Sequence, residues 1–220
     1  MSTRIAILIF DALTALDAVG PYEVLSRIPD AEVRFVAKEA GTKRTDTGAL
    51  GLQADAALTE LPDPEVLLVP GGRGNRPLLE DAEVLDWVRH AHEGSMWTTS
   101  VCTGSLVLGA AGILDGKRAT THWAYLDRLG ELGAEAVGER VVEDGKVLTA
   151  AGVSSGIDMA LTLAARIAGE TVAQAIQLGI EYDPQPPFDT GAPSKAPAPI
   201  RELVTAVMRD AESTLLAEAT

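Results

Sequence analysis

The residue with the clearest chemical potential is Cys102, the only cysteine among 220 residues. It follows the apolar segment Trp97–Val101 and precedes Thr103–Leu106, which contains a glycine and is typical of a helix start. A strand that turns sharply into a helix presents its turn residue at the sheet edge, with the first helical N–H groups directed at it. These donors and the helix dipole favour the nucleophilic thiolate. A lone cysteine is more often a buried small hydrophobe, so its setting carries the catalytic hypothesis.

Two adjacent glycines, Gly71 and Gly72, come directly after the apolar segment Val66–Val69 and Pro70. Ligands of open α/β sheets bind beyond the carboxyl ends of the strands, where we expect this loop and Cys102 to lie. Glycine lets the backbone approach a substrate, and its N–H can stabilise a developing anion. We therefore expect the Gly72 N–H to contribute to an anion hole. The alternative is a plain flexible turn.

Asp17 is the acidic candidate, because it follows the first apolar segment and should lie at the same sheet edge. A carboxyl group close to Cys102 could donate and accept protons. Asp17 also precedes Gly20-Pro21, which we interpret as a helix start. Taken alone, this position favours a helix N-cap or a solvated loop carboxylate. Glu23 falls within the expected helix and is predicted to be exposed.

The three histidines do not form a metal site. His90 and His92 lie two residues apart in an expected helix, roughly 200° around its axis, and cannot chelate one metal ion. We expect both to be solvated. His122 could orient a catalytic group or be a structural histidine, and the sequence leaves both open. Because no phosphate-binding loop, dinucleotide fingerprint or metalloprotease motif is present, we expect no cofactor and no metal.

Continuous apolar segments alternate with helical patterns along the chain. Continuous hydrophobicity is typical of parallel strands covered by helices on both faces, so the alternation predicts a three-layer α/β sandwich. The expected strands are Ile5–Phe10, Glu32–Ala37, Val66–Val69 and Trp97–Val101, followed by a hairpin of Val141–Glu143 and Val147–Thr149 around Asp144-Gly145. The expected helices are Ala82–Glu93, Leu106–Ala111, Ala124–Gly133, Met159–Ala168 after a capping box at Ser155–Asp158, and Ile200–Ala217. We predict a single domain over 1–220, in which 182–220 is a proline-rich extended arm plus the last helix.

The composition limits the classes of function. The formal net charge of −14 and pI near 4.6 argue against binding to nucleic acid or to an anionic membrane surface. One cysteine excludes an internal disulfide and a multi-cysteine metal site, and is typical of a reducing cytoplasm. The first apolar segment, which Asp11 interrupts, is too short for a secretory signal. No segment approaches the roughly 20 apolar residues that span a bilayer.

These motifs together resemble the ThiJ/PfpI superfamily, whose members are flavodoxin-like α/β domains with a mostly parallel sheet and a cysteine nucleophile elbow. The similarity covers most of the chain and is greatest to the branch of bacterial isocyanide hydratases. The motifs that carry it are the Asp17 region, Val-Pro-Gly-Gly at 69–72, Ser-Val-Cys-Thr-Gly-Ser at 100–105, the segment 114–123 ending in Thr-Thr-His-Trp, Gly-Ile-Asp-Met-Ala-Leu at 156–161, and 181–188.

The resemblance implies hydration of a small uncharged isocyanide to an N-substituted formamide, without a cofactor, by a protein that is commonly a homodimer. Cys102 would attack the substrate carbon and form a covalent thioimidate, and Asp17 would donate the proton and then help to activate water. The backbone N–H groups of Gly72 and Thr103 would stabilise the developing charge.

Relatives with other functions define the alternatives. PfpI-type peptidases have histidine after the nucleophile, whereas this chain has Thr103, which argues against proteolysis. AraC-type regulators share the cysteine and Thr-Thr-His-Trp motifs but add a helix-turn-helix region, for which we expect no counterpart after Pro199. A glyoxalase-like enzyme acting on methylglyoxal usually relies on glutamate and histidine near the thiol, which Asp17 and Thr103 support less well. A noncatalytic ligand or redox sensor based on Cys102 is the other alternative.

Overall fold

The computed structural model describes the backbone of residues 2–218 and the side chains of residues 2–208. The chain divides into two units, residues 1–180 and residues 181–220. The first unit contains the sheet and the residues singled out above. The second contains helix α7, Ala198–Glu218, preceded by a segment from residue 181 to 197 without helix or strand. No helix in the described part of the chain is both long and apolar enough to cross a membrane.

The first unit is built on a seven-stranded sheet in the order β10-β11-β7-β6-β1-β2-β5. All neighbouring strands are parallel except the β10–β11 hairpin at one edge, and the five strands from β2 to β11 have the flavodoxin order 2-1-3-4-5. The strands are β1 (Thr3–Leu8), β2 (Ala31–Ala37), β5 (Ala56–Ala57), β6 (Val66–Val69), β7 (Trp97–Val101), β10 (Val141–Asp144) and β11 (Val147–Ala150). The expected flavodoxin-like sheet is therefore confirmed.

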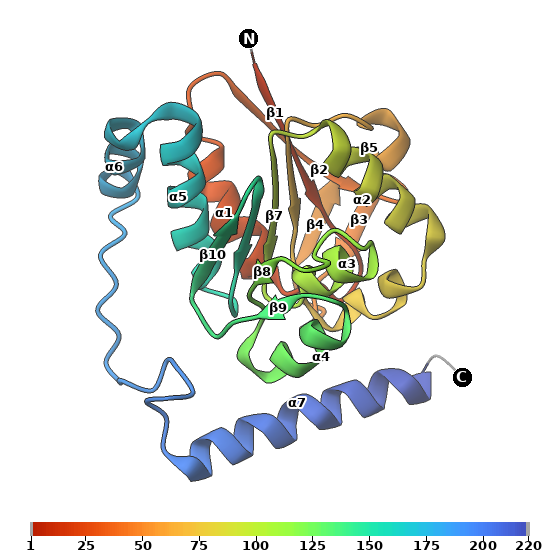
Figure 1. Ribbon diagram of the computed structural model, residues 1–220, viewed down its shortest axis with the longest axis vertical. Helices are drawn as coiled ribbons and strands as arrows, with labels where there is room; N and C mark the ends of the chain where they lie inside the picture. The colour runs from red at the N-terminus through yellow and green to blue at the C-terminus, as the bar shows by residue number, and fades with distance from the viewer. Residues whose placement is uncertain (1, 219–220) are drawn as a thin grey trace. The chain divides into compact units, whose positions relative to one another are not determined.

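Helices cover both faces of this sheet (Figure 1). Helices α1 (Ala15–Leu25) and α5 (Ser155–Ala168) pack together on one face, and α6 (Glu170–Gly179) packs against α5. Helices α2 (Ala82–Gly94) and α3 (Gly104–Ala110) lie on the other face, and α4 (Leu126–Glu131) packs against α3. Because both faces are covered, β6 is buried at every position, which explains its uninterrupted apolar sequence.

Short elements complete the unit, and the sequence pattern did not predict them because they are brief or polar. Two small sheets pair β3 (Gly41–Arg44) with β4 (Gly51–Ala54), and β8 (Arg118–Ala119) with β9 (Glu135–Ala136). Single turns of 3₁₀ helix are found at η1 (Leu58–Glu60), η2 (Arg73–Asn75), η3 (Pro77–Leu79) and η4 (Trp123–Tyr125).

The start of α1 corrects the sequence analysis. The helix begins at Ala15, and Gly20 and Pro21 lie inside it rather than at its start. Close packing between α1 and α5 explains the glycines on both sides of the contact, Gly20 and Gly156. A Cβ atom at Gly20 would lie 3.2 Å from a side-chain carbon of Ile157, and a Cβ atom at Gly156 would lie 3.2 Å from the Pro21 ring.

The start of α5 and the hairpin turn also differ from expectation. The N-cap of α5 is Ser154, which makes no side-chain capping hydrogen bond, so the predicted capping box does not form. The Ser155 hydroxyl donates instead to the carbonyl of Gly152 at 3.3 Å. In the hairpin, Asp144 still belongs to β10, and the turn lies one residue later than predicted, at Gly145 and Lys146.

Candidate active site

Three chain segments meet beyond the carboxyl ends of adjacent strands. Strand β1 leads into the helix that carries Asp17, β6 leads into the Gly71-Gly72 loop, and β7 ends directly before Cys102. The side chain of Asp17 contacts both other segments, because it accepts a hydrogen bond from Gly71 and interacts with the Cys102 thiol. The three candidate segments that the sequence placed at this edge are therefore in contact there.

Cys102 lies at a strained turn between β7 and α3, as the sequence predicted. Its φ of +56° falls in the left-handed region that residues with a Cβ atom rarely adopt. The next helix starts at Gly104, where a Cβ atom would lie only 2.0 Å from the carbonyl oxygen of Val69. The sharp turn therefore needs a glycine at this position, and it brings the cysteine close to the end of β6.

The Asp17 side chain is fully buried in the first two turns of α1, which rules out the solvated or N-cap role that its position in the sequence favoured. Its Oδ2 accepts a hydrogen bond from the Gly71 N–H at 3.0 Å, whereas Oδ1 has no partner with ordinary hydrogen-bond geometry among the described residues. Burial raises the pKa of Asp17 from the ordinary 3.8 to about 7, while the Gly71 N–H and the Cys102 thiol oppose that rise. Near neutral pH this carboxyl group can therefore both donate and accept a proton.

The surroundings of Cys102 shift its thiol pKa upward, whereas the elbow donors alone would favour the thiolate. Burial and the negative charge of Asp17 raise the thiol pKa. The backbone N–H groups of Thr103 and Val153 act in the opposite direction and lower the thiol pKa. Burial outweighs these donors, and a base is needed to generate the nucleophile.

The Gly71-Gly72 loop uses its N–H groups differently from what the sequence suggested. The Gly72 N–H donates to the Thr103 hydroxyl at 3.1 Å, so it is occupied within the protein, and the Gly71 N–H donates to Asp17. A Cβ atom at Gly71 would lie 2.5 Å from the Thr103 nitrogen and 3.0 Å from Oδ2 of Asp17. The loop is thus packed between the acid and the elbow. The assignment of Gly72 and Thr103 as catalytic N–H donors remains a prediction.

Two side chains near the elbow make contacts that the sequence analysis did not predict. The buried amide of Asn75 donates to the carbonyl of Thr103 at 2.7 Å, and the hydroxyl of Thr121 donates to the carbonyl of Cys102 at 2.9 Å. Each joins a distant loop to the backbone of the elbow. Thr121 belongs to the Thr-Thr-His-Trp motif, whereas Asn75 follows the glycine loop in a position that no motif marks.

His122 is partly buried and neutral near pH 7, because desolvation lowers its pKa to about 4. Its Nδ1 accepts a hydrogen bond from the Ala124 N–H at 3.3 Å. Its ring packs directly against Gly152, because a Cβ atom at Gly152 would lie only 2.5 Å from Cδ2 of the histidine. These contacts favour the structural role for His122. The ring nevertheless lies directly beside the loop that supplies the Val153 N–H to the thiol.

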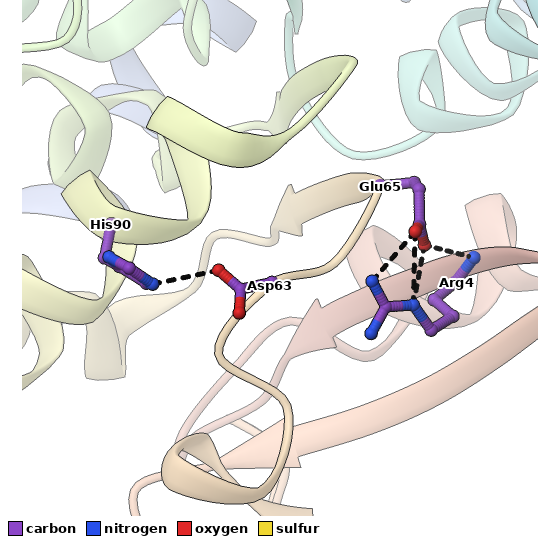
Figure 2. Close-up of polar contacts among 4 residues, drawn as sticks. All are labelled: Arg4, Asp63, Glu65 and His90. Atoms are coloured by element: carbon purple, nitrogen blue, oxygen red, sulfur yellow. Dashed lines mark hydrogen bonds and ion pairs between the residues drawn. The ribbon is translucent and has the colours of Figure 1, made fainter.

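The remaining candidates lie away from the elbow. The His90 ring pairs with Asp63 at 2.9 Å on the surface (Figure 2). His92, which we expected to be solvated, is half-buried, and its Nδ1 hydrogen-bonds with the Thr98 hydroxyl at 2.8 Å. Glu23 is exposed, as predicted, and pairs with Arg27.

Fold and site together define a flavodoxin-like α/β protein with a buried cysteine at a strand-to-helix elbow and a buried acid beside its thiol. The family model described as the DJ-1/PfpI family matches residues 3–166, so the chain belongs to the DJ-1/PfpI family.

Individual relatives cover the chain to different extents. Isonitrile hydratase from Pseudomonas putida is 48% identical over 200 residues, which cover 91% of this chain and 87% of that protein. The crystal structure of a ThiJ/PfpI family protein from Pseudomonas syringae has a TM-score of 0.92 at 36% identity and covers 97% of this chain and 90% of that one. The HTH-type transcriptional regulator CdhR of Pseudomonas aeruginosa is 30% identical over 171 residues, which cover 74% of this chain but 49% of the regulator.

Proposed function

We propose that this protein is a cofactor-independent isocyanide (isonitrile) hydratase that converts an isocyanide, R–N≡C, into the N-substituted formamide R–NH–CHO. The observation that carries the proposal is the buried pair of Asp17 and Cys102, in which a carboxyl group with a pKa near 7 interacts with a neutral thiol. The similarity to the isonitrile hydratase of P. putida along nearly the whole chain supports the choice of substrate.

The first step joins the sulfur of Cys102 to the substrate. The ionised Asp17 accepts the thiol proton while the sulfur attacks the terminal carbon and forms a C–S bond. The electron pair left on that carbon then takes the proton from Asp17. The product is the thioimidate R–N=CH–S–Cys102, and Asp17 is again ionised. Because the resting thiol has a raised pKa, this step depends on a base beside it.

The second step consumes one water molecule. Asp17 accepts a proton as the water oxygen adds to the thioimidate carbon, and it passes that proton to the substrate nitrogen. The resulting adduct, R–NH–CH(OH)–S–Cys102, collapses as the C–S bond breaks and the hydroxyl proton moves to the sulfur through Asp17. The formamide leaves, and both side chains return to their starting protonation states.

Backbone N–H groups are proposed to stabilise the charge that develops on the sulfur and on the adduct. The N–H groups of Thr103 and Val153, which hydrogen-bond to the thiol, support this role. The Gly72 N–H would join them only where the Thr103 hydroxyl releases it. A preorganised donor of this kind typically contributes about 10²–10³-fold to kcat.

We further propose the surroundings in which the enzyme works. Its single free cysteine favours a reducing cytoplasm, and the acidic composition favours a small uncharged substrate over nucleic acid or an anionic membrane. The proposed chemistry uses no metal or cofactor. By resemblance to its superfamily, we propose that the protein acts as a homodimer.

The assay that tests the proposal uses an aryl isocyanide and the full-length protein. We expect formamide to accumulate with the wild-type protein and not with Cys102→Ala, which removes the nucleophile. Equal turnover by the two proteins, or none by the wild type, would contradict the proposal. Lactate formation from methylglyoxal, measured in parallel, would indicate the glyoxalase alternative. Reversible sulfenic acid formation at Cys102 without turnover of either substrate would indicate a sensor.

A further inference from the structure

We propose that Thr121 is a positioning residue, whose hydroxyl holds Cys102 in its strained conformation and thereby keeps the thiol against its N–H donors. The inference assigns a role to the Thr-Thr-His-Trp motif, which the proposed mechanism does not use. It rests on the proposed function only for the claim that this conformation serves isocyanide hydration.

The backbone of Cys102 is held on both sides. Its N–H lies within hydrogen-bond distance of the carbonyls of Ala150, at 3.1 Å, and Ala151, at 3.0 Å. Its carbonyl accepts from the hydroxyls of Thr121, at 2.9 Å, and Ser105, at 3.2 Å. A positive φ at a residue with a Cβ atom persists only where surrounding contacts impose it. These four contacts can impose it here.

Only one of the two hydroxyls can hold the elbow against the rest of the protein. Ser105 lies three residues after Cys102, in the first turn of α3, so its hydrogen bond is local and moves with the elbow. Thr121 is 19 residues away along the chain, beyond α3 and β8. Its hydrogen bond therefore fixes the carbonyl of Cys102 relative to a different part of the fold.

The segment that carries Thr121 is itself anchored. The N–H of Thr120 donates to the Thr149 hydroxyl on β11 at 2.9 Å, and the Thr120 hydroxyl donates to the carbonyl of Glu139 at 2.8 Å. On the other side, the His122 ring packs on Gly152, next to Val153. The motif thus connects β11, the elbow and the loop whose N–H reaches the thiol. A shift of Cys102 relative to this segment would increase the distance between its sulfur and the Val153 N–H.

The test compares Thr121→Val, which keeps the shape and removes the hydroxyl, with Thr121→Ser, which keeps the hydroxyl. The matched control is Thr99→Val on β7. Thr99 is also buried, and its hydroxyl donates to a backbone carbonyl, that of Leu67, at 3.0 Å, but it does not bond to the elbow. The measurements are the rate of Cys102 alkylation by iodoacetamide between pH 6 and 10, kcat and KM for an aryl isocyanide, and the melting temperature.

For Thr121→Val we expect alkylation to slow about tenfold at each pH in this range, because the sulfur loses N–H donation and its thiolate form is destabilised further. We expect kcat to fall by at least about tenfold, with KM changed by less than about threefold. Thr121→Ser should restore both rates, and Thr99→Val should lower the melting temperature without moving either profile. Should Thr121→Val fail to fold, Thr121→Ala takes its place.

A wild-type alkylation profile in Thr121→Val, or in the Thr121→Ala variant that replaces it, would overturn the inference. So would equal losses in Thr121→Val and Thr99→Val, since a general loss of stability would then explain both. If the wild-type protein does not hydrate isocyanides, the proposed function fails, but the alkylation profile still decides whether Thr121 positions the thiol.

Discussion

The ionisable side chains at the two ends of the central sheet differ in their burial and in their hydrogen-bond partners. At the amino ends of the strands, Arg4 pairs with Glu65 at 2.8 Å and Asp63 with His90 at 2.9 Å, all of them partly open to solvent (Figure 2). At the carboxyl ends, Asp17 is buried, and one of its oxygens has no ordinary hydrogen-bond partner in the described structure. The exposed carboxyl groups have hydrogen-bond partners, whereas the buried acid lies beside a thiol.

The contrast shows that surroundings, not residue type, decide what a carboxyl group can do. Hydrogen bonds from Arg4 lower the pKa of Glu65 and keep it ionised, so it serves only as an ion-pair partner. Burial raises the pKa of Asp17 to about 7, which allows it to exchange protons near neutrality. Perturbed groups of this kind are typical of catalytic sites.

The same contrast gives the two carboxyl groups opposite effects on stability. Because the folded pKa of Asp17 lies above its ordinary value, its contribution is fully present below pH 3.8 and is lost as the pH rises through about 7. The pKa of Glu65 is lowered, so its contribution is present at neutral pH and is lost on acidification. Each of the following predictions tests one side of this comparison.

The largest effect is expected for Asp17→Asn. Without a proton acceptor beside the thiol, isocyanide hydration should fall by about 10²–10⁴-fold. Because the buried negative charge is gone, the free energy of unfolding of the variant should exceed that of the wild type above pH 7, by as much as about 4 kcal/mol, and its melting temperature should be higher. Assays and thermal melts at pH 5 and pH 8 check both effects. Lower stability than the wild type at pH 8 would show that the charge is well accommodated.

A smaller effect is expected in the pH profile. In wild-type protein, kcat/KM should rise through an apparent pKa near 7 as Asp17 ionises. His122 is neutral throughout this range, since its pKa is about 4, so His122→Gln should retain this rise even if its overall rate is lower. Initial rates between pH 5 and 9 measure the profile. Loss of the rise in His122→Gln would assign the titration to the histidine.

The smallest effect is expected at the amino ends of the strands. Replacing Glu65 by Gln removes an exposed ion pair and should cost less than about 1 kcal/mol of stability at pH 7, with hydration kinetics unchanged. The difference from wild type should shrink on acidification, as Glu65 becomes protonated below its ordinary pKa. Denaturant titrations at pH 3.5 and pH 7 measure it. A large loss of activity in Glu65→Gln would mean that the two ends of the sheet are coupled.

The sequence predicted the elbow and the order of the main elements, because β6 and β7 are continuous apolar segments followed by glycine-containing turns. It favoured the wrong environment for Asp17, since a lone aspartate near a Gly-Pro pair resembles a cap until α5 packs against α1. The contacts of Asn75 and Thr121 gave no signal, because each joins a side chain to a carbonyl distant in the chain. The sequence also did not predict that the Gly72 N–H donates to the Thr103 hydroxyl, because this contact depends on the rotamer of Thr103.

Gly156 marks a limit on how this site can diversify. A Cβ atom there would lie 3.0 Å from a side-chain carbon of Val101, the residue before the nucleophile, and 3.2 Å from Pro21, one helical turn after the acid. One extra methyl group would therefore press against Val101, which precedes Cys102, and against Pro21, which lies in the helix that carries Asp17. A larger side chain at this position would require Val101 or Pro21 to move by a few tenths of an ångström, which couples any change at Gly156 to both sides of the site.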